Sequence, residues 1–150
     1  MDILEADSPL SDANMNVQTI QWEDALPIRH RVLWPSKPPL FCKVDGDETA
    51  THYGAYIDGE LVSVASIYIE GKTARLRKFA TLPHFQNKGI GSQVIAHIMK
   101  ALNVIGINYF WCDARESAVS FYQRFGMQTL GEPFIKSGIP YYKMEIRLTQ

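Results

Sequence analysis

A short glycine-rich stretch, Gln86-Asn87-Lys88-Gly89-Ile90-Gly91-Ser92, is the part of the sequence best suited to chemistry with an anion. It lies between a strand-like segment and a segment with helical periodicity. The first turn of a helix has unpaired backbone N–H groups and the positive end of the helix dipole, so phosphates bind there. Glycines let a phosphate approach the backbone, and Gln86, Asn87 and Lys88 add side-chain donors and one cation. The stretch therefore predicts a pyrophosphate-binding turn.

Two well-known phosphate motifs do not fit this stretch. A P-loop requires G-x-x-x-x-G-K-[ST], whereas Lys88 precedes its glycine. A dinucleotide fingerprint requires G-x-G-x-x-G, but Gly89 and Gly91 are followed by Val94. A loop whose glycines only permit a turn fits the local residues equally well, so both interpretations stay open on this stretch alone.

Upstream of the turn, the sequence predicts three consecutive antiparallel strands. The segments 52–57 and 60–69 flank Asp58-Gly59, a dipeptide favoured in hairpin turns where both central residues need positive φ. A second turn at 70–72 leads to the segment 73–82. The polar residues 1–14 are expected to be a loose N-terminal arm, followed by a first strand in 16–22.

Helical and strand-like periods alternate in the rest of the chain. The segment 23–33 suggests a short helix entered near Pro27, and the proline-rich segment 34–40 suggests a loop. After Gly91, the apolar residues at helical spacing are Val94, Ile95, Ile98 and Leu102. A strand in 107–114, a helix in 115–125 that stops at Gly126, and two closing strands follow. Strands that run into helices and back predict a mixed sheet with helices on its faces.

Composition limits the classes of function. The chain has 150 residues, which suggests one domain, and its net charge of −1 gives no indication of nucleic-acid binding. Cys42 and Cys112 form no Cys-x-x-Cys pair, which favours reduced thiols and argues against a zinc site or disulfide scaffold. No signal peptide or membrane-spanning run is evident, so we expect a cytoplasmic protein that holds no metal.

Two motifs resemble those of one enzyme family. The segment 76–99, with its Q-x-x-G-x-G turn, resembles the acetyl-CoA-binding motif of the GNAT N-acetyltransferase superfamily. The segment 114–127 resembles the second family motif, A-x-x-F-Y-x-x-x-G-F, with Met127 in place of the final Phe. The matching positions are Ala118, Phe121, Tyr122, Gly126 and Met127. The flanking strands follow the family's order, so the resemblance covers most of the chain.

The resemblance implies a GNAT-like α+β fold and acetyl-CoA as co-substrate. The expected sheet is central, mostly antiparallel and twisted, with a splayed parallel strand pair and helices on both faces. The pantetheine arm would dock on the backbone of Phe79, Ala80 and Thr81, and the pyrophosphate on Gln86, Asn87, Lys88, Gly89, Ile90, Gly91 and Ser92. Arg115 stands where many members have a cofactor-binding Asn, and an arginine is an alternative donor.

The reaction implied by the resemblance is transfer of an acetyl group to a primary amine by direct attack on the thioester. Tyr122 is the family-based candidate that protonates the leaving thiolate, although its place on an apolar stripe also fits a core residue. No general base is evident. Asp113 is one candidate but fits better as the cap of a helix beginning near Arg115, and Glu70 and His52 are weaker candidates.

Other functions remain open at this stage. A non-catalytic acyl-CoA-binding or sensing module would keep the phosphate turn and lose the chemistry, and a structural protein would bind no nucleotide. The expected acceptor is an amine of a small molecule or a peptide, with a protein lysine also left open by the sequence, and a homodimer is expected only by analogy with the family. Three aromatic residues fit either an acceptor pocket or ordinary burial, and four basic residues fit either phosphate attraction or a solvated face. These residues are Trp34, Tyr141 and Tyr142, and Lys72, Arg75, Arg77 and Lys78.

Overall fold

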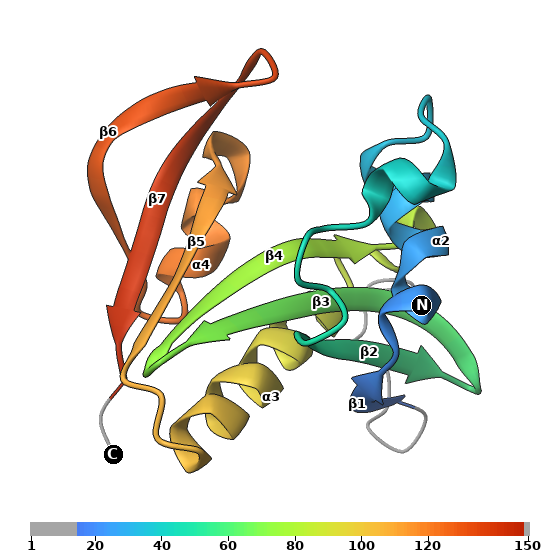
Figure 1. Cartoon of the computed structure of the whole chain (residues 1–150), viewed down its shortest axis with the longest axis horizontal. Coiled ribbons are helices and arrows are strands. Elements are labelled where there is room, and N and C mark those ends of the chain that lie inside the picture. Colours follow the sequence, from blue (N-terminus) through green and yellow to red (C-terminus); the bar gives the residue numbers. More distant parts are fainter. Residues whose placement is uncertain (1–14, 149–150) are drawn as a thin grey trace, which may run out of the picture. The chain divides into compact units, whose positions relative to one another are not determined.

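A computed structural model describes residues 15–148 and shows strands and helices in the expected alternation (Figure 1). Its strands are β1 (Met15–Ile20), β2 (Thr51–Ile57), β3 (Glu60–Glu70), β4 (Thr73–Thr81), β5 (Tyr109–Arg115), β6 (Gln128–Lys136) and β7 (Ile139–Arg147). Its α-helices are α2 (Trp22–Leu33), α3 (Ile90–Val104) and α4 (Val119–Gln123). Short 3-10 helices span Pro39–Cys42, Pro83–Phe85 and Glu116–Ala118. Residues 1–14, for which the sequence predicts a loose arm, lie outside the described residues.

The described strands form one seven-stranded mixed sheet, in the order β1-β2-β3-β4-β5-β7-β6. β4 and β5 pair in parallel, from Thr73 opposite Tyr109 to Leu76 opposite Cys112. The pairs β1–β2, β5–β7 and β6–β7 are antiparallel. The predicted α+β class, with one parallel pair in a mixed sheet, is therefore confirmed.

The chain divides into two compact units, which are described separately below. Unit 1 contains residues 15–66 and 78–98 of the described part, and unit 2 contains residues 67–77 and 99–148. The boundary therefore falls inside β3, β4 and α3.

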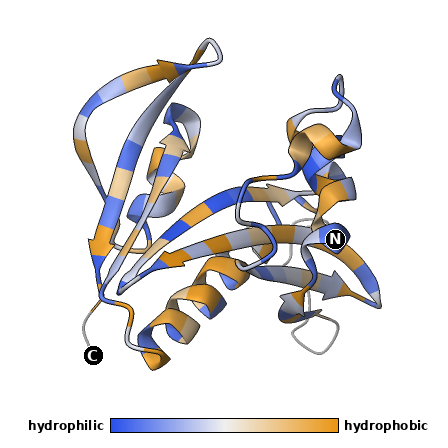
Figure 2. Cartoon of the chain, viewed as in Figure 1, coloured by the Kyte–Doolittle hydropathy of each residue, from blue (hydrophilic) through white to orange (hydrophobic). Residues whose placement is uncertain are grey.

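The core of unit 1 is built by the hairpin and the helix that the sequence predicts. Asp58 and Gly59 both have positive φ, at 50° and 85°, as the expected hairpin turn requires. In α3, Val94, Ile95 and Ile98 are fully buried, which confirms the predicted helical stripe. The hydropathy view shows this apolar stripe interrupted by polar positions (Figure 2). Burying one such side chain contributes roughly 1.5–3 kcal/mol, so the stripe fixes which face of α3 meets the sheet.

The first helix ends at Leu33 as predicted but begins earlier than predicted. α2 begins at Trp22, not near Pro27, because Asp24 accepts a hydrogen bond from the backbone N–H of Gln21 at 3.2 Å and closes the first turn. Pro27 lies inside the helix and leaves only the carbonyl of Glu23 without its helical donor. The expected loop at 34–40 is also shorter, because a 3-10 helix starts at Pro39.

A buried ion pair holds the segment after α2 within unit 1. Arg29 donates to both carboxylate oxygens of Asp47, at 2.8 and 3.0 Å, and both side chains are fully buried. Arg29 also donates to the Cys42 carbonyl and to the Ser66 hydroxyl. The Ser66 hydroxyl in turn lies 2.7 Å from Nδ1 of His52. The network ties α2, β2, β3 and the segment between them into one polar core.

Unit 2 is built on the alternation of side chains in β5 and β7. Phe110, Cys112, Ala114 and Met144 are buried, whereas their strand neighbours are partly exposed. α4 lies against β5 and β7 and is shorter than the predicted helix, because its first turn is 3-10 (Figure 1). Gly126 ends it as predicted, with φ of +90°.

Candidate active site

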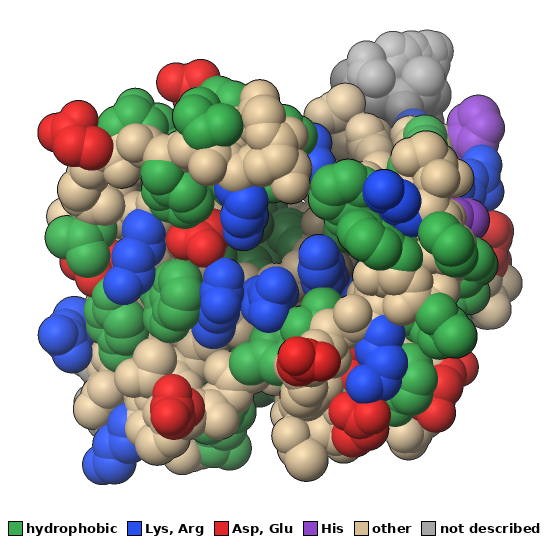
Figure 3. Space-filling view, turned by 45° about the horizontal axis from the view of Figure 1, so that its top comes forward, with side chains coloured by type: hydrophobic (Ala, Val, Ile, Leu, Met, Phe, Trp, Pro, Cys, Tyr) green, Lys and Arg blue, Asp and Glu red, His purple; other side chains and the backbone are tan. Residues whose placement is uncertain are grey.

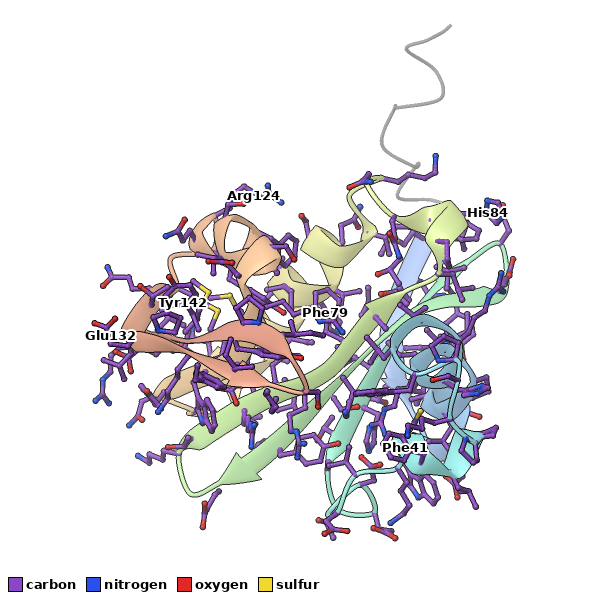
Figure 4. All side chains as sticks on the ribbon, turned by 90° about the horizontal axis from the view of Figure 1, so that it is seen from above. Phe41, Phe79, His84, Arg124, Glu132 and Tyr142 are labelled. Carbon is purple, nitrogen blue, oxygen red and sulfur yellow. The ribbon has the colours of Figure 1, made fainter. Side chains whose placement is uncertain are left out.

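The connection from β4 to α3 in unit 1 is held by short hydrogen bonds. The Leu82 N–H donates to the Val62 carbonyl at 2.9 Å, which anchors the end of β4. The side-chain amide of Gln86 donates to the Thr81 carbonyl at 2.9 Å and folds the turn back onto the strand. Figure 4 labels Phe79 on β4 and His84 on the 3-10 helix that follows it. The side chain of Gln86, for which the sequence predicts a phosphate contact, therefore binds the backbone of its own turn.

The turn reaches α3 through two left-handed residues. Asn87 has φ of 62° and Gly89 has φ of 85°. A Cβ added to Gly89 would meet nothing within 4 Å, so the site requires glycine for its backbone angle and leaves open space beside it. A helical hydrogen bond runs from the Gln93 N–H to the Gly89 carbonyl at 3.2 Å. Gly89 therefore directly precedes the first residue of α3 and accepts a hydrogen bond from its first turn.

The start of α3 has the features that hold a phosphate group. α3 is 15 residues long and has no acidic side chain in its first turn. In a helix that starts at Ile90, the N–H groups of Ile90, Gly91 and Ser92 have no acceptor within the helix. Ile90 is buried and fixes the turn, while Gly91 and Ser92 are partly exposed. The dipole and the unpaired donors of this helix start are the features that bind anionic groups in proteins.

The strand before this turn carries a local irregularity at Lys78. Lys78 has φ of 55°, a left-handed angle that costs a non-glycine residue roughly 1–2 kcal/mol. It precedes Phe79, Ala80 and Thr81, whose backbone is the predicted pantetheine contact. The Ser63 hydroxyl lies 2.8 Å from the Thr81 hydroxyl and donates to the Ala80 carbonyl at 3.3 Å. Nothing in the sequence indicated the left-handed residue, because lysine has no preference for that region.

In unit 2, the predicted acid Tyr122 lies in the core of the unit. Its side chain is 7% exposed on α4, and its hydroxyl is hydrogen-bonded to the thiol of Cys112 on β5, which is 2% exposed. Burial, together with Cys112, raises the pKa of Tyr122 well above its ordinary value of 10.0. Burial raises the pKa of Cys112 to about 12, an effect that the nearby Asp113 charge reinforces. The phenol therefore stays protonated and able to donate at neutral pH.

The candidate bases have other partners. Asp113 accepts a hydrogen bond from Arg75 at 3.0 Å and lies 3.9 Å from the Lys136 amine, both in unit 2. The prediction that Asp113 caps the next helix is wrong, because β5 continues for two residues to Arg115. His52 is 3% exposed inside the polar core of unit 1. Glu70 is exposed at the end of β3.

The remaining predicted residues are placed as follows. Arg115 is exposed at the end of β5, opposite Tyr141 in the strand register. Tyr141 stacks on Phe134 with ring centroids 5.9 Å apart, and Tyr142 is partly exposed on the same strand. Trp34 packs edge-on against Phe41 in unit 1, at 5.4 Å. Arg115 and Tyr122 therefore belong to unit 2, whereas the phosphate turn belongs to unit 1.

Three features of the structure have no counterpart among the predictions from the sequence. From the sequence Cys112 is expected only to be a reduced thiol, although its place in the alternation of β5 also indicates burial. The Arg29–Asp47 pair joins residues far apart in sequence and has no local signal. A pocket of about 200 Å³ in unit 1 is lined in part by Gln21, Trp22 and His52.

Two kinds of feature are absent from residues 15–148. No helix in residues 15–148 is long and apolar enough to cross a membrane. In the same residues, no cluster of three or more His, Cys, Asp or Glu side chains is arranged to hold a metal ion.

Comparison with known proteins identifies the family. The sequence model described as "Acetyltransferase (GNAT) domain" matches residues 42–148. The Bacillus subtilis (strain 168) protein named "Uncharacterized N-acetyltransferase YitI" is 37% identical over 134 residues, covering 83% of this chain and 90% of that protein.

Solved structures show the same fold at low sequence identity. The ribosomal-protein-S18-alanine N-acetyltransferase from Escherichia coli has a TM-score of 0.75 at 15% identity, covering 91% of this chain and 95% of that chain. A GNAT family acetyltransferase from Elizabethkingia anophelis with acetyl-CoA bound has a TM-score of 0.70 at 17% identity. That match covers 92% of this chain and 100% of the other.

The family model and the Bacillus subtilis relative lead to one conclusion. The chain belongs to the GNAT acetyltransferase family and is an acyltransferase.

Proposed function

We propose that this enzyme binds acetyl-CoA on the β4–α3 turn and transfers the acetyl group to the primary amine of a small molecule or a peptide. The observation that carries the proposal is the start of α3, where the left-handed Gly89 opens a helix without acidic residues in its first turn. Residues 86–92 would hold the pyrophosphate, and Arg115 would add a further donor. The backbone of Phe79, Ala80 and Thr81 would bind the amides of the pantetheine arm.

The proposed reaction is a direct attack. The neutral amine nitrogen forms a bond with the thioester carbonyl carbon, and the carbon–sulfur bond then breaks. The thiolate of CoA leaves and takes a proton from Tyr122, whose pKa is raised by burial and which is therefore protonated at neutral pH. The attacking nitrogen loses its extra proton to water, because Asp113 and His52 are engaged by other side chains. Tyr122 regains its proton from the solvent.

The cellular setting is part of the proposal. Cys42 and Cys112 are both buried and unbridged, which fits the reducing conditions of the cytoplasm. The absence of a nucleic-acid partner and the formation of a homodimer remain predictions.

Amine-dependent release of CoA thiol tests the proposal. The full chain is incubated with acetyl-CoA and a panel of small amines and peptides, and free thiol and acetylated product are both measured. We expect stoichiometric thiol and product with at least one class of amine. Tight binding of acetyl-CoA without turnover on any amine would support the alternative, a non-catalytic acyl-CoA sensor.

A further inference from the structure

One face of the sheet in unit 2 carries an unusual density of cations over aromatic rings. Side chains alternate along a strand, so residues opposite each other in the register share a face. The register places Arg75 opposite Trp111, Tyr109 opposite Arg147, and Asp113 opposite Lys143. The cation–aromatic face is defined by Arg75, Tyr109, Trp111, Tyr141, Lys143 and Arg147. These residues are all partly or fully exposed, whereas the residues between them in β5 are buried.

The contacts on this face are short. The Arg75 guanidinium lies 4.5 Å from the centroid of Trp111, and the Lys143 amine lies 4.7 Å from the same ring. The Arg147 guanidinium lies 4.9 Å from the Tyr109 centroid, and the Lys136 amine of β6 lies 4.8 Å from that of Tyr141. Significant cation–π contacts occur roughly once per 70–80 residues, so this cluster is far denser than chance predicts. The rings hold the cations in fixed positions at the surface.

The charges on the face are unbalanced. Asp113 forms ion pairs with Arg75 at 3.0 Å and with Lys136 at 3.9 Å, and Glu145 accepts a hydrogen bond from the Tyr109 hydroxyl. Within residues 15–148, neither Lys143 nor Arg147 forms an ion pair with a carboxylate. Asp113 and Glu145 lie on the same face, but the cations Arg75, Lys136, Lys143 and Arg147 outnumber them, so the face carries an excess of positive charge in a chain whose net charge is −1. The space-filling view shows basic side chains interspersed with hydrophobic ones (Figure 3).

We infer that the cation–aromatic face binds an acidic peptide segment of a partner protein. A guanidinium that lies over a ring keeps its edge N–H groups directed to the sides, where they can donate to a carboxylate. Side-chain carboxylates spaced along an extended peptide could meet the cations of successive strands. The aromatic rings around each cation partly exclude water. The ion pair between that cation and a peptide carboxylate is therefore stronger, because screening and competition from water are reduced.

The same contacts argue against single-stranded nucleic acid as the occupant. Such ligands bind by stacking bases on open aromatic faces. Here Trp111, Tyr109 and Tyr141 each already have a cation over the ring. Asp113 and Glu145 would also repel a continuous phosphate backbone, whereas a peptide can place neutral residues opposite them.

Fluorescence anisotropy with a labelled peptide tests the inference. The probe is a twelve-residue peptide of Glu and Gly, longer when extended than the nine-residue strand β7, and its matched control has Gln in place of Glu. We expect salt-sensitive binding of the Glu peptide to the full chain and no binding of the Gln peptide. The double substitution Lys143→Glu/Arg147→Glu should weaken binding at least about tenfold, a change of about 1.4 kcal/mol. Lys100→Glu, an exposed lysine on α3, should have no effect.

Further variants and ligands distinguish an acidic peptide from the other possible occupants of this face. If charge reversal disturbs folding, Lys143→Gln/Arg147→Gln keeps similar side-chain size and should weaken binding in the same direction. Equal binding of the Glu and Gln peptides, or unchanged binding in both double variants, would overturn the inference. Tighter binding of an oligonucleotide of equal charge would assign the face to nucleic acid. Salt-sensitive self-association without peptide binding would assign it to a second copy. None of these measurements depends on acetyl transfer, so the proposed function can fail or succeed independently.

Discussion

The hydroxyl of Tyr122 on α4 is hydrogen-bonded to the thiol of Cys112 on β5, and both side chains are buried in unit 2. This hydrogen bond fixes the orientation of the hydroxyl, which would otherwise be free to rotate. In the proposed reaction, a fixed hydroxyl can give its proton to the leaving thiolate without first paying the entropy of being ordered. Cys112 is thus expected to act on Tyr122 as a positioning residue.

Tyr122→Phe is expected to lower kcat by about 10²-fold or more, since that is the usual contribution of a general acid. KM for acetyl-CoA should change little, because the phenol acts on the leaving thiolate and not on the bound ground state. Steady-state kinetics with a reactive amine and a thermal melt check this prediction. Tyr56→Phe, a partly exposed tyrosine of β2, is the control and should retain full kcat. Equal kcat in both variants would remove Tyr122 from the chemistry.

Cys112→Ala is expected to lower kcat by a smaller factor, about tenfold, because it removes the hydrogen bond that orients Tyr122 and leaves the phenol in place. Cys112→Ser keeps a hydroxyl and should recover part of the loss. A double-mutant cycle gives the decisive comparison. In the Tyr122→Phe background, Cys112→Ala should have no further effect on kcat, whereas an additive loss would show that Cys112 acts only through packing.

Stability should fall in alkaline solution because of the buried thiol. The pKa of Cys112 is raised from its ordinary value of 9.0 to about 12. Below pH 9 the thiol is neutral in both states, so its contribution to stability is fully present. Between about pH 9 and 12 only the unfolded chain loses the proton, so the free energy of unfolding should fall by up to about 1.4 kcal/mol per pH unit.

Urea unfolding at several alkaline pH values measures this slope. Cys112→Ser should make the slope smaller. Part of the slope should remain, because burial and the hydrogen bond to Glu145 also raise the pKa of Tyr109 to about 12. A slope identical to that of the unsubstituted chain would contradict the assignment.

Breaking the Arg29–Asp47 ion pair of unit 1 should lower the free energy of unfolding substantially. Asp47→Asn leaves the Arg29 charge buried without its carboxylate, and such a change typically costs about 3–5 kcal/mol. The exposed pair of Lys43 and Glu48, 2.7 Å apart, gives the control, because Glu48→Gln should leave stability nearly unchanged. Chemical denaturation of both variants tests the prediction. Similar stability losses in the two variants would mean that burial does not set the strength of the Arg29–Asp47 pair.

The features that the sequence predicted correctly depend on neighbours in the chain. Asp58-Gly59 specifies its turn through two left-handed residues, and Gly126 ends α4 through the same property. The stripe of Val94, Ile95 and Ile98 identifies α3 because helical periodicity needs only local spacing.

Three other features are not specified by local residue preferences. Pro27 predicts a helix boundary, whereas the capping contact of Gln21 and Asp24 sets the true start of α2. Lys78 adopts its left-handed angle without any residue preference for it. The Cys112–Tyr122 contact joins a strand to a helix, and a single sequence contains no signal for such a pair.

Binding of acetyl-CoA to two glycine variants tests the central claim most directly, namely that the glycine-lined start of α3 holds the diphosphate. Gly89 and Gly59 both have φ of +85°, and an added Cβ meets nothing within 4 Å at either position. Each change to Ala should therefore cost a similar amount of stability, about 1 kcal/mol.

By calorimetry, Gly89→Ala is expected to weaken acetyl-CoA binding about tenfold or more, because the new Cβ lies in the path of the phosphate. Gly59→Ala should bind as tightly as the unsubstituted chain. Equal affinity in all three proteins would contradict the account, because acetyl-CoA would then be held elsewhere.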